Sequence, residues 1–172
     1  MIRQAVRGDA AAIAASWNPL IRDTLVTFQP HPRTPAEIAA LITARAGQGH
    51  PFLVAHLARD IHGFATYAQF RPGPGYAKSM EHTVILAPGQ QGRGLGRKLM
   101  AALEDHARIR GVRVMVGAIT AENTDSLLFH ARLGYAEVGR MPQVGWKFGR
   151  HHDLVLMQKL LQRRMGDSPS SG

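Results

Sequence analysis

Residues 89–100, "GQQGRGLGRKLM", place glycines at positions 92, 94 and 96 directly before an apolar run that favours helix. Glycine is a poor residue for opening a helix, so the backbone here must need freedom from side chains. The stretch follows "MEHTVILA", residues 80–87, which alternates like a strand and is ended by Pro88. The two segments predict a strand, a tight turn and a helix that runs to about residue 110.

The glycine stretch does not match two well-known phosphate-binding loops. A P-loop requires Gly-Lys followed by Ser or Thr, whereas Gly96 is followed by Arg97 and Lys98. A dinucleotide fingerprint would require a further glycine at position 97 or 99, where this chain has arginine and leucine. Free backbone amides at a helix N-terminus still form an anion site, to which Arg93 adds positive charge. The glycines alone are equally compatible with a tight turn that binds nothing.

The rest of the chain predicts a mixed α/β fold. Apolar alternation and turn residues predict strands at residues 1–6, 51–57, 61–70, 112–119, 135–144 and 153–161. Helices are expected from an N-cap at Asp9 to Trp17, from the capping box "TPAE" at 34–37 to residue 46, and across residues 123–134. We expect one domain over residues 1–165 and a loose tail at 166–172.

Composition excludes several classes of protein. The 172 residues are 45% hydrophobic and 19% charged, as in a globular domain, and include no cysteine, so disulfides, thiolate zinc sites and cysteine nucleophiles are excluded. No apolar run is long enough to span a membrane, and the N-terminus does not resemble a signal peptide. We therefore expect a cytoplasmic protein without a membrane partner.

The formal net charge of +9 indicates an anionic partner. Nucleic acid is one candidate and a phosphorylated cofactor is another. Aromatic residues make up only 6% of the chain, and no basic stripe with interleaved aromatics is present. We expect no nucleic-acid partner, and a basic nucleic-acid-binding module is kept as the non-enzyme alternative.

The spacing Gln91-x-x-Gly94-x-Gly96 resembles the acetyl-CoA pyrophosphate signature of the GNAT N-acetyltransferases. About thirty residues later, "NTDSLLFHARLGY", residues 123–135, is similar to the next cofactor segment of that family. The resemblance implies acetyl-CoA as the acetyl donor. It also implies the GNAT fold, a mostly antiparallel twisted sheet of about seven strands, splayed at the acetyl-CoA site and flanked by about four helices.

A narrower resemblance, over roughly residues 1–161, is to the phosphinothricin and methionine sulfoximine N-acetyltransferases. It is carried by "TLVTFQP" at 24–30, "QFRPGPGY" at 69–76, "MEHTVIL", "FHARLGY" and "GRMPQVGWKFGRHHDLVLMQ" at 139–158. It implies a small amino-acid-like substrate and a homodimer, with Lys147 and Arg150 near a neighbouring subunit. The chain departs from the subgroup at Phe70, Ile85 and His151, where an aromatic residue or tryptophan is usual.

Glu81 and His130 are the expected catalytic residues. Attack on a thioester requires a neutral amine, so a base must remove a proton from the ammonium group. Strand alternation puts Glu81 and Thr83 on one face and His82 on the other, and the resemblance assigns the glutamate as that base. His130 could return a proton to the leaving thiolate. The alternatives are a surface glutamate and a packed helical histidine.

The resemblance implies further contacts to acetyl-CoA. Amides of the strand before the glycine loop would hold the pantetheine arm and the thioester oxygen. The glycine loop would hold the pyrophosphate, and Asn123 would bond the pantetheine or cap its own helix. The expected cofactor-binding residues are Val84, Ile85, Leu86, Gln91, Gly92, Arg93, Gly94, Leu95, Gly96, Arg97, Asn123 and Ser126.

The substrate is expected to carry a carboxylate, for which Arg71 offers a bidentate partner in a Pro/Gly loop. The other expected substrate-binding residues are Phe28, Phe70, His82 and Thr83. No metal is expected: residues 151–153, "HHD", point in alternate directions on a strand, and no His-Glu-x-x-His motif occurs.

Two further alternatives remain, one of them within the enzyme class. The chain could acetylate another amine, such as a peptide N-terminus or a polyamine, although a polyamine site should be rich in acids and the chain has 12 acidic residues. It could also be a degenerate GNAT fold that binds CoA without catalysis.

Overall fold

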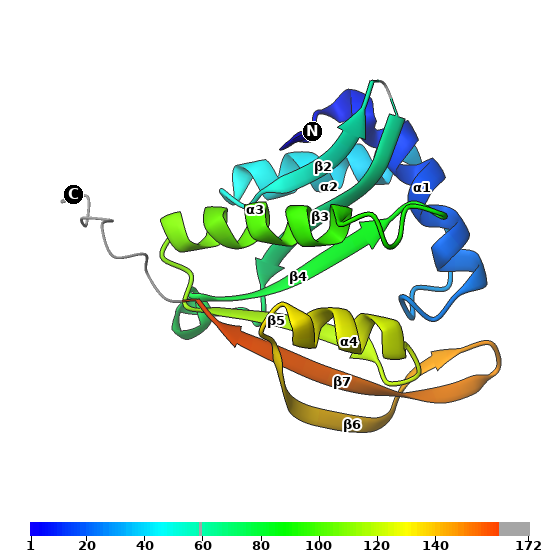
Figure 1. The fold of residues 1–172 in the computed structure, drawn as a ribbon, viewed down its shortest axis with the longest axis vertical. Coiled ribbons are helices and arrows are strands. Elements are labelled where there is room, and N and C mark those ends of the chain that lie inside the picture. Colours follow the sequence, from blue (N-terminus) through cyan, green and yellow to red (C-terminus); the bar gives the residue numbers. More distant parts are fainter. Residues whose placement is uncertain (59, 162–172) are drawn as a thin grey trace.

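The computed structural model describes residues 1–58 and 60–161, which form a seven-stranded sheet with helices on both faces (Figure 1). The tail expected at 166–172 lies outside these residues, as does the end of the expected domain. The strands are β1 (Ile2–Gln4), β2 (Phe52–Leu57), β3 (Asp60–Gln69), β4 (Ser79–Leu86), β5 (Val114–Thr120), β6 (Ala136–Lys147) and β7 (Arg150–Leu160). The α-helices in the described part are α1 (Ala10–Asp23), α2 (Pro35–Gly47), α3 (Leu95–Ile109) and α4 (Thr124–Arg132).

The sheet has the strand order β1-β2-β3-β4-β5-β7-β6, and its pairs are antiparallel except for β4 with β5. The parallel pair is short, because only residues 79–81 of β4 pair with residues 114–116 of β5. Beyond these residues the two strands part. The mixed α/β fold with a mostly antiparallel, splayed sheet is therefore confirmed.

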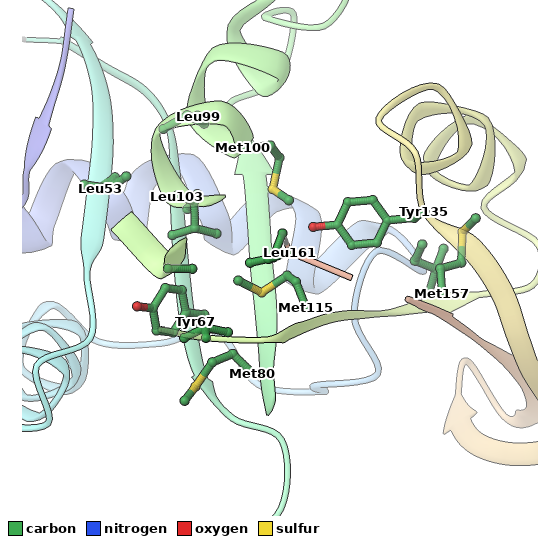
Figure 2. Packing of buried hydrophobic residues seen from close by; sticks show 14 of the residues in the cluster. Leu53, Tyr67, Met80, Leu99, Met100, Leu103, Met115, Tyr135, Met157 and Leu161 are labelled. Carbon is green, nitrogen blue, oxygen red and sulfur yellow. The ribbon is translucent and has the colours of Figure 1, made fainter. Parts of the chain in front are cut away.

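On one face of the sheet, α3 packs through residues spaced at helical intervals. Leu99, Met100 and Leu103 are fully buried against Tyr67 and other side chains of the sheet, as Figure 2 shows. This spacing of three and four residues is that of a helix with one apolar face. Side chains of α4 border the same cluster.

The opposite face of the sheet is covered by α1 and α2. Trp17 and Ile21 of α1 meet Ile38 and Ile42 of α2 over Phe64 of β3. The Trp17 and Phe64 rings lie edge to face with their centroids 4.9 Å apart. The sheet is thus buried between two apolar layers, and a group on β4 can face either layer according to its position in the strand.

Local signals predicted most helix boundaries. The capping box at the start of α2 is present: Thr34 N–H donates to Glu37 Oε2 at 2.7 Å, and Glu37 N–H donates to Thr34 Oγ1 at 3.2 Å. Helix α3 begins at Leu95 and ends at Ile109, close to the predicted bounds. No helix among the described residues combines the length and the apolar character needed to cross a bilayer.

The expected end of the first helix was wrong. Helix α1 does not end at Trp17 but continues through Pro19 to Asp23, because Ile21 extends its buried face. Asp9 is the N-cap residue, as expected, but its carboxylate makes no capping hydrogen bond to α1; it accepts hydrogen bonds from Arg3 and from the N–H of Val6.

The last two strands are also longer than expected. β6 runs to Lys147 and β7 starts at Arg150, so the segment between residues 144 and 153 is a β-hairpin. Its turn places Phe148 and Gly149 at positive φ, 53° and 73°. An aromatic residue at positive φ is unusual, which is why the sequence pattern gave no turn there.

Leu103 provides a test of the α3 layer. We expect Leu103→Ala to lower the free energy of unfolding by about 2–5 kcal/mol, because it leaves a cavity in the core. Ile109 of the same helix is 78% exposed, so Ile109→Ala should change it by about 0.5 kcal/mol or less. Urea unfolding of both variants measures the difference. Equal losses would contradict the packing described for α3.

Candidate active site

A cavity of about 460 Å³ lies where β4 and β5 part. Its walls include residues 81–85 of β4 and residues 117–120 of β5. Residues 26–29 from the segment after α1 also line it, together with Asn123, Ser126 and His130 near and in α4. The cavity therefore joins the layer of α1 and α2 to the layer of α4 through the gap in the sheet.

The alternation of β4 is as predicted. Ile85 belongs to the apolar cluster under α1 and α2, whereas Met80 and Val84 pack with the cluster under α3. Glu81 and Thr83 share the face of Ile85, and His82 lies on the other face. All three line the cavity, so it receives a carboxylate from one face and an imidazole from the other.

Glu81 is a half-buried carboxylic acid. Within the described residues its carboxylate takes part in no hydrogen bond or ion pair. Burial raises the pKa of Glu81 above its ordinary value, because desolvation penalises the charged form. A carboxylate with a raised pKa holds a proton more readily, so Glu81 is suited to accept one from a ligand.

His82 and His130 form a stacked pair under the gap. Their ring centroids are 5.0 Å apart with an angle of 9° between the planes. Burial lowers the pKa of both imidazoles, that of His82 to about 3, so both are neutral near pH 7. Gly117 leaves room for this arrangement, since a Cβ there would lie 3.0 Å from His82 Nε2.

The hydrogen bonding of His130 limits what it can do. Its Nδ1 lies 2.7 Å from the backbone oxygen of Ser126, which assigns the ring proton to Nδ1. The remaining nitrogen, Nε2, is buried and has no partner among the described residues. His130 Nε2 is therefore an acceptor, and it can donate a proton only after it has received one.

The glycine loop is open on the side where a ligand would approach. Gly92 and Gly94 adopt positive φ, 75° and 74°, and no other group lies within 4 Å of a Cβ built on either. Gly94 is the N-cap of α3 and supplies no side chain to its first amides. Free amides at a helix N-terminus can bind an anion such as a pyrophosphate.

The structure requires a glycine at position 96 for a different reason than at positions 92 and 94. A Cβ on Gly96 would lie 3.1 Å from Phe129 of α4, so its absence allows α3 and α4 to pack together. Of the other expected cofactor residues, Val84, Ile85, Asn123 and Ser126 line the cavity. The following loop residues are exposed: Gln91, Gly92, Arg93, Gly94 and Arg97.

Asn123 caps α4, since its Oδ1 accepts a hydrogen bond from Ser126 N–H at 3.1 Å. The helix-capping role considered from the sequence is thus observed. Because Asn123 also lines the cavity, the cap places a polar side chain in a wall to which Ser126 and His130 also contribute.

Only some of the expected substrate residues meet in the cavity. Phe28, His82 and Thr83 line it, whereas Phe70 and Arg71 are not among its lining residues. Arg71 is exposed in the loop after β3, with its guanidinium carbon 5.8 Å from the centroid of the Tyr76 ring.

The segment after α1, which forms one wall of the cavity, is fixed by residues that sequence motifs did not identify. Lys147 is 5% exposed, and its ammonium group donates to the backbone oxygens of Ile21, Thr24 and Thr27, the last two at 2.6 and 2.8 Å. Thr120 Oγ1 donates to the backbone oxygen of Leu25 at 2.6 Å. Lys147 is therefore engaged within its own chain.

Phe28 is held by the same hairpin. Its ring occupies the space that a side chain at Gly145 would need, and it stacks on His152 with centroids 5.8 Å apart. His152 in turn lies 2.7 Å from Glu122, which also pairs with Arg150. The described residues contain no cluster of His, Cys, Asp and Glu arranged to bind a metal.

The sequence also missed three residues that line the cavity beneath α1 and α2: Trp17, Arg33 and Arg45. They come from α1, from the segment before α2 and from α2. No motif links them, because only the packing of the two helices brings them together.

The family profile and the similar proteins all indicate the same family. The sequence profile of the acetyltransferase (GNAT) family matches residues 17–135. The chain is 42% identical over 158 residues to an L-methionine sulfoximine/L-methionine sulfone acetyltransferase of Pseudomonas paraeruginosa, covering 91% of this chain and 92% of that protein. It is 34% identical to a phosphinothricin N-acetyltransferase of Streptomyces coelicolor, covering 93% and 95%.

A solved structure extends the likeness to the fold. An acetyltransferase from Salmonella typhimurium, determined with acetyl-CoA, superimposes with a TM-score of 0.91 at 36% sequence identity, covering 98% of each chain.

The glycine loop yields a prediction about donor binding. Gly94→Val should raise the KM for acetyl-CoA about tenfold or more, because lost amide–phosphate hydrogen bonds are worth about 1.5–3 kcal/mol each. A valine at Gly94 is also strained by the positive φ of this position, so the control must share that strain. Gly149 has a φ of 73° and a Cβ there meets nothing within 4 Å, so Gly149→Val is the matched control. Steady-state kinetics give KM, and thermal melting checks the fold. An unchanged KM in a folded Gly94→Val enzyme would refute the role of the loop.

Proposed function

The chain belongs to the GNAT family and is an N-acetyltransferase, and we propose that its acceptor is the α-amine of a small amino acid of the methionine sulfoximine, methionine sulfone or phosphinothricin type. The observation that carries the proposal is the unpartnered, half-buried Glu81 in a cavity that reaches both faces of the sheet. The relatives named above act on such substrates by their names. The cavity is lined by two arginines, Arg33 and Arg45, and by a single acid, Glu81, which disfavours a polyamine.

The donor side would bind acetyl-CoA through backbone groups. The amides around Gly92 and Gly94 would bond the pyrophosphate, and Arg93 and Arg97 would add charge. Alternate residues of β4 beyond Glu81 direct N–H groups toward the gap, where those of 84–86 would bond the pantetheine and the thioester oxygen. Bound acetyl-CoA supplies the activated acetyl group.

The acceptor side would prepare the amine. Glu81 would accept a proton from the ammonium group, which gives the nitrogen the lone pair that it needs to attack. Its raised pKa brings the carboxylate closer in basicity to the amine, so the proton transfer is less unfavourable than for an ordinary glutamate. Thr83 and His82 would border the amine from the two faces.

His130 would manage the second proton. The bond from Nδ1 to the Ser126 backbone fixes the ring, and Nε2 is available at the cavity wall. After attack on the thioester, the nitrogen carries a second proton that it must lose; Nε2 would accept this proton and donate it to the thiolate as the C–S bond breaks. Ser126 and Asn123 would hold the adjoining part of the donor.

Arg71 would bind the substrate carboxylate, and Phe28 and Phe70 would line the pocket for the substrate side chain. In support, Ala68 of β3 pairs with Glu81 across the strands, and Arg71 follows three residues later at that end of β3. A carboxylate and an amine on the same carbon could therefore face Arg71 and Glu81 together. The bidentate fork of arginine suits this contact.

We also propose that the enzyme is a homodimer and works in the cytoplasm, where acetyl-CoA and free amino acids occur together. The hairpin of β6 and β7 exposes apolar side chains that a second copy would cover: Val138 (56%), Val144 (49%), Trp146 (59%) and Phe148 (57%). Arg150 lies beside them, so it would sit at the edge of that interface.

The first test is thiol release from acetyl-CoA with a panel of amines. The panel contains phosphinothricin, methionine sulfoximine, methionine sulfone, unmodified amino acids, spermidine and a short peptide. We expect turnover with the first three and little with spermidine or the peptide. Activity confined to the peptide or to spermidine would replace the proposed substrate class.

The role of Glu81 is tested by Glu81→Gln. We expect kcat/KM to fall by about 10²- to 10⁴-fold, the usual contribution of a general base. In the wild type, kcat/KM should decline as pH falls through an apparent pKa above that of an ordinary glutamate, because the protonated carboxyl cannot accept a proton.

The acid limb of this pH profile should be absent from Glu81→Gln. Glu137 is an exposed carboxylate on β6, so Glu137→Gln is the control and should retain the wild-type profile. A Glu81→Gln enzyme with wild-type activity across the pH range would show that another group is the base.

A further inference from the structure

The wall of the cavity beneath α1 and α2 carries three hydrogen-bond donors with no partner. Trp17 Nε1, Arg33 Nε and Arg45 Nε are buried and bond to no atom of the described residues. All three residues line the cavity, and we call them the donor wall. An indole and two guanidinium groups contain no acceptor, so the donor wall can pair only with acceptor atoms.

The donor wall is held in place by its surroundings. The side chain of Asn18 forms two hydrogen bonds with the backbone of Arg33, donating to its oxygen at 2.9 Å and accepting from its N–H at 2.8 Å. The guanidinium carbon of Arg33 lies 5.1 Å from the centroid of the Trp17 ring, a cation–π distance. Trp17 itself packs on Phe64 of the sheet. The donors are therefore positioned before any ligand arrives.

Neither Arg33 nor Arg45 has an ion pair among the described residues. The charge of Arg33 acts at longer range on Glu37, an exposed carboxylate outside the cavity lining. Burial, and then the charge of Arg33, lower the pKa of Arg45, as expected for a half-buried cation beside a like charge. Buried donors and unpaired charge both cost free energy, which a ligand with oxygen acceptors would recover.

The donor wall lies further along β4 than Glu81. Glu81 is followed on its face by Thr83 and then Ile85, and Ile85 pairs across the strands with Phe64, on which Trp17 packs. Glu81 makes no ion pair with either arginine, although all of them line the cavity. The acceptor side thus has a proton-accepting group at one place and oxygen-binding groups at another.

We propose that the donor wall is a subsite for the oxygen atoms at the side-chain end of the substrate, as in a sulfone, a sulfoximine or a phosphinate. This inference rests on the proposed function and deepens it. In such groups the oxygens are bonded to a tetrahedral sulfur or phosphorus atom and accept hydrogen bonds, whereas the thioether sulfur of methionine is a weak acceptor. The subsite therefore favours the oxidised or phosphinyl amino acid over the unmodified one.

The experiment compares methionine sulfone with methionine as acceptors for the wild type, Trp17→Phe and Arg45→Met. Each variant keeps most of the apolar packing and removes donors. The kcat/KM for the sulfone should fall about 3- to 10-fold in Trp17→Phe and about 10- to 100-fold in Arg45→Met, from the usual worth of neutral and charged hydrogen bonds. The kcat/KM for methionine should fall by a smaller factor, so the ratio of the sulfone value to the methionine value should fall in both variants.

Arg113 is an exposed arginine that precedes β5 at the end away from the cavity. The control variant Arg113→Met should change kcat/KM for neither the sulfone nor methionine. Equal losses with both amino acids, or no loss with the sulfone, would overturn the subsite. Equal kcat/KM values of the wild type for methionine and the sulfone would also overturn the subsite, but they would leave the proposed function intact. A wild-type enzyme inactive on every amino acid would instead reject the proposed function, and the subsite with it.

Discussion

The parting of β4 from β5 is the constraint on which the site depends. Strands joined by a crossover helix are parallel here, and only Ser79–Glu81 of β4 pair with β5 before the two diverge. Had the pairing continued, the sheet would have closed the passage between its faces. Instead, the backbone beyond Glu81 is left open on one side, and a carboxylate and two imidazoles reach the same cavity from opposite layers.

The net charge of +9 has a local meaning in this arrangement. Arg93 and Arg97 stand at the free amides of α3 on one side of the sheet, and Arg33 and Arg45 line the cavity on the other. Lys147 has a structural role, because its ammonium group donates hydrogen bonds to three backbone oxygens. Part of the positive charge thus lies where the proposed ligands would present oxygen atoms, and part of it orders the cavity wall.

Local sequence patterns predicted the parts of the structure that depend on neighbours in the chain. The glycine loop with its helix, the capping box at Thr34 and the alternation of Glu81 with His82 follow from spacing alone. The hydrogen bonds from Lys147 to Ile21, Thr24 and Thr27 join residues more than a hundred positions apart, so no local sequence pattern can indicate them. The packing reason for Gly96 was missed likewise, because it depends on Phe129.

The division of the cavity between two layers has an evolutionary consequence. In the proposed arrangement, part of the acceptor wall comes from α1, α2 and the segment between them, whereas β4, α3 and α4 would hold acetyl-CoA. Substitutions that accumulate within residues 17–45 of a duplicated gene would then alter the acceptor wall, while the residues proposed for the acetyl donor would stay the same.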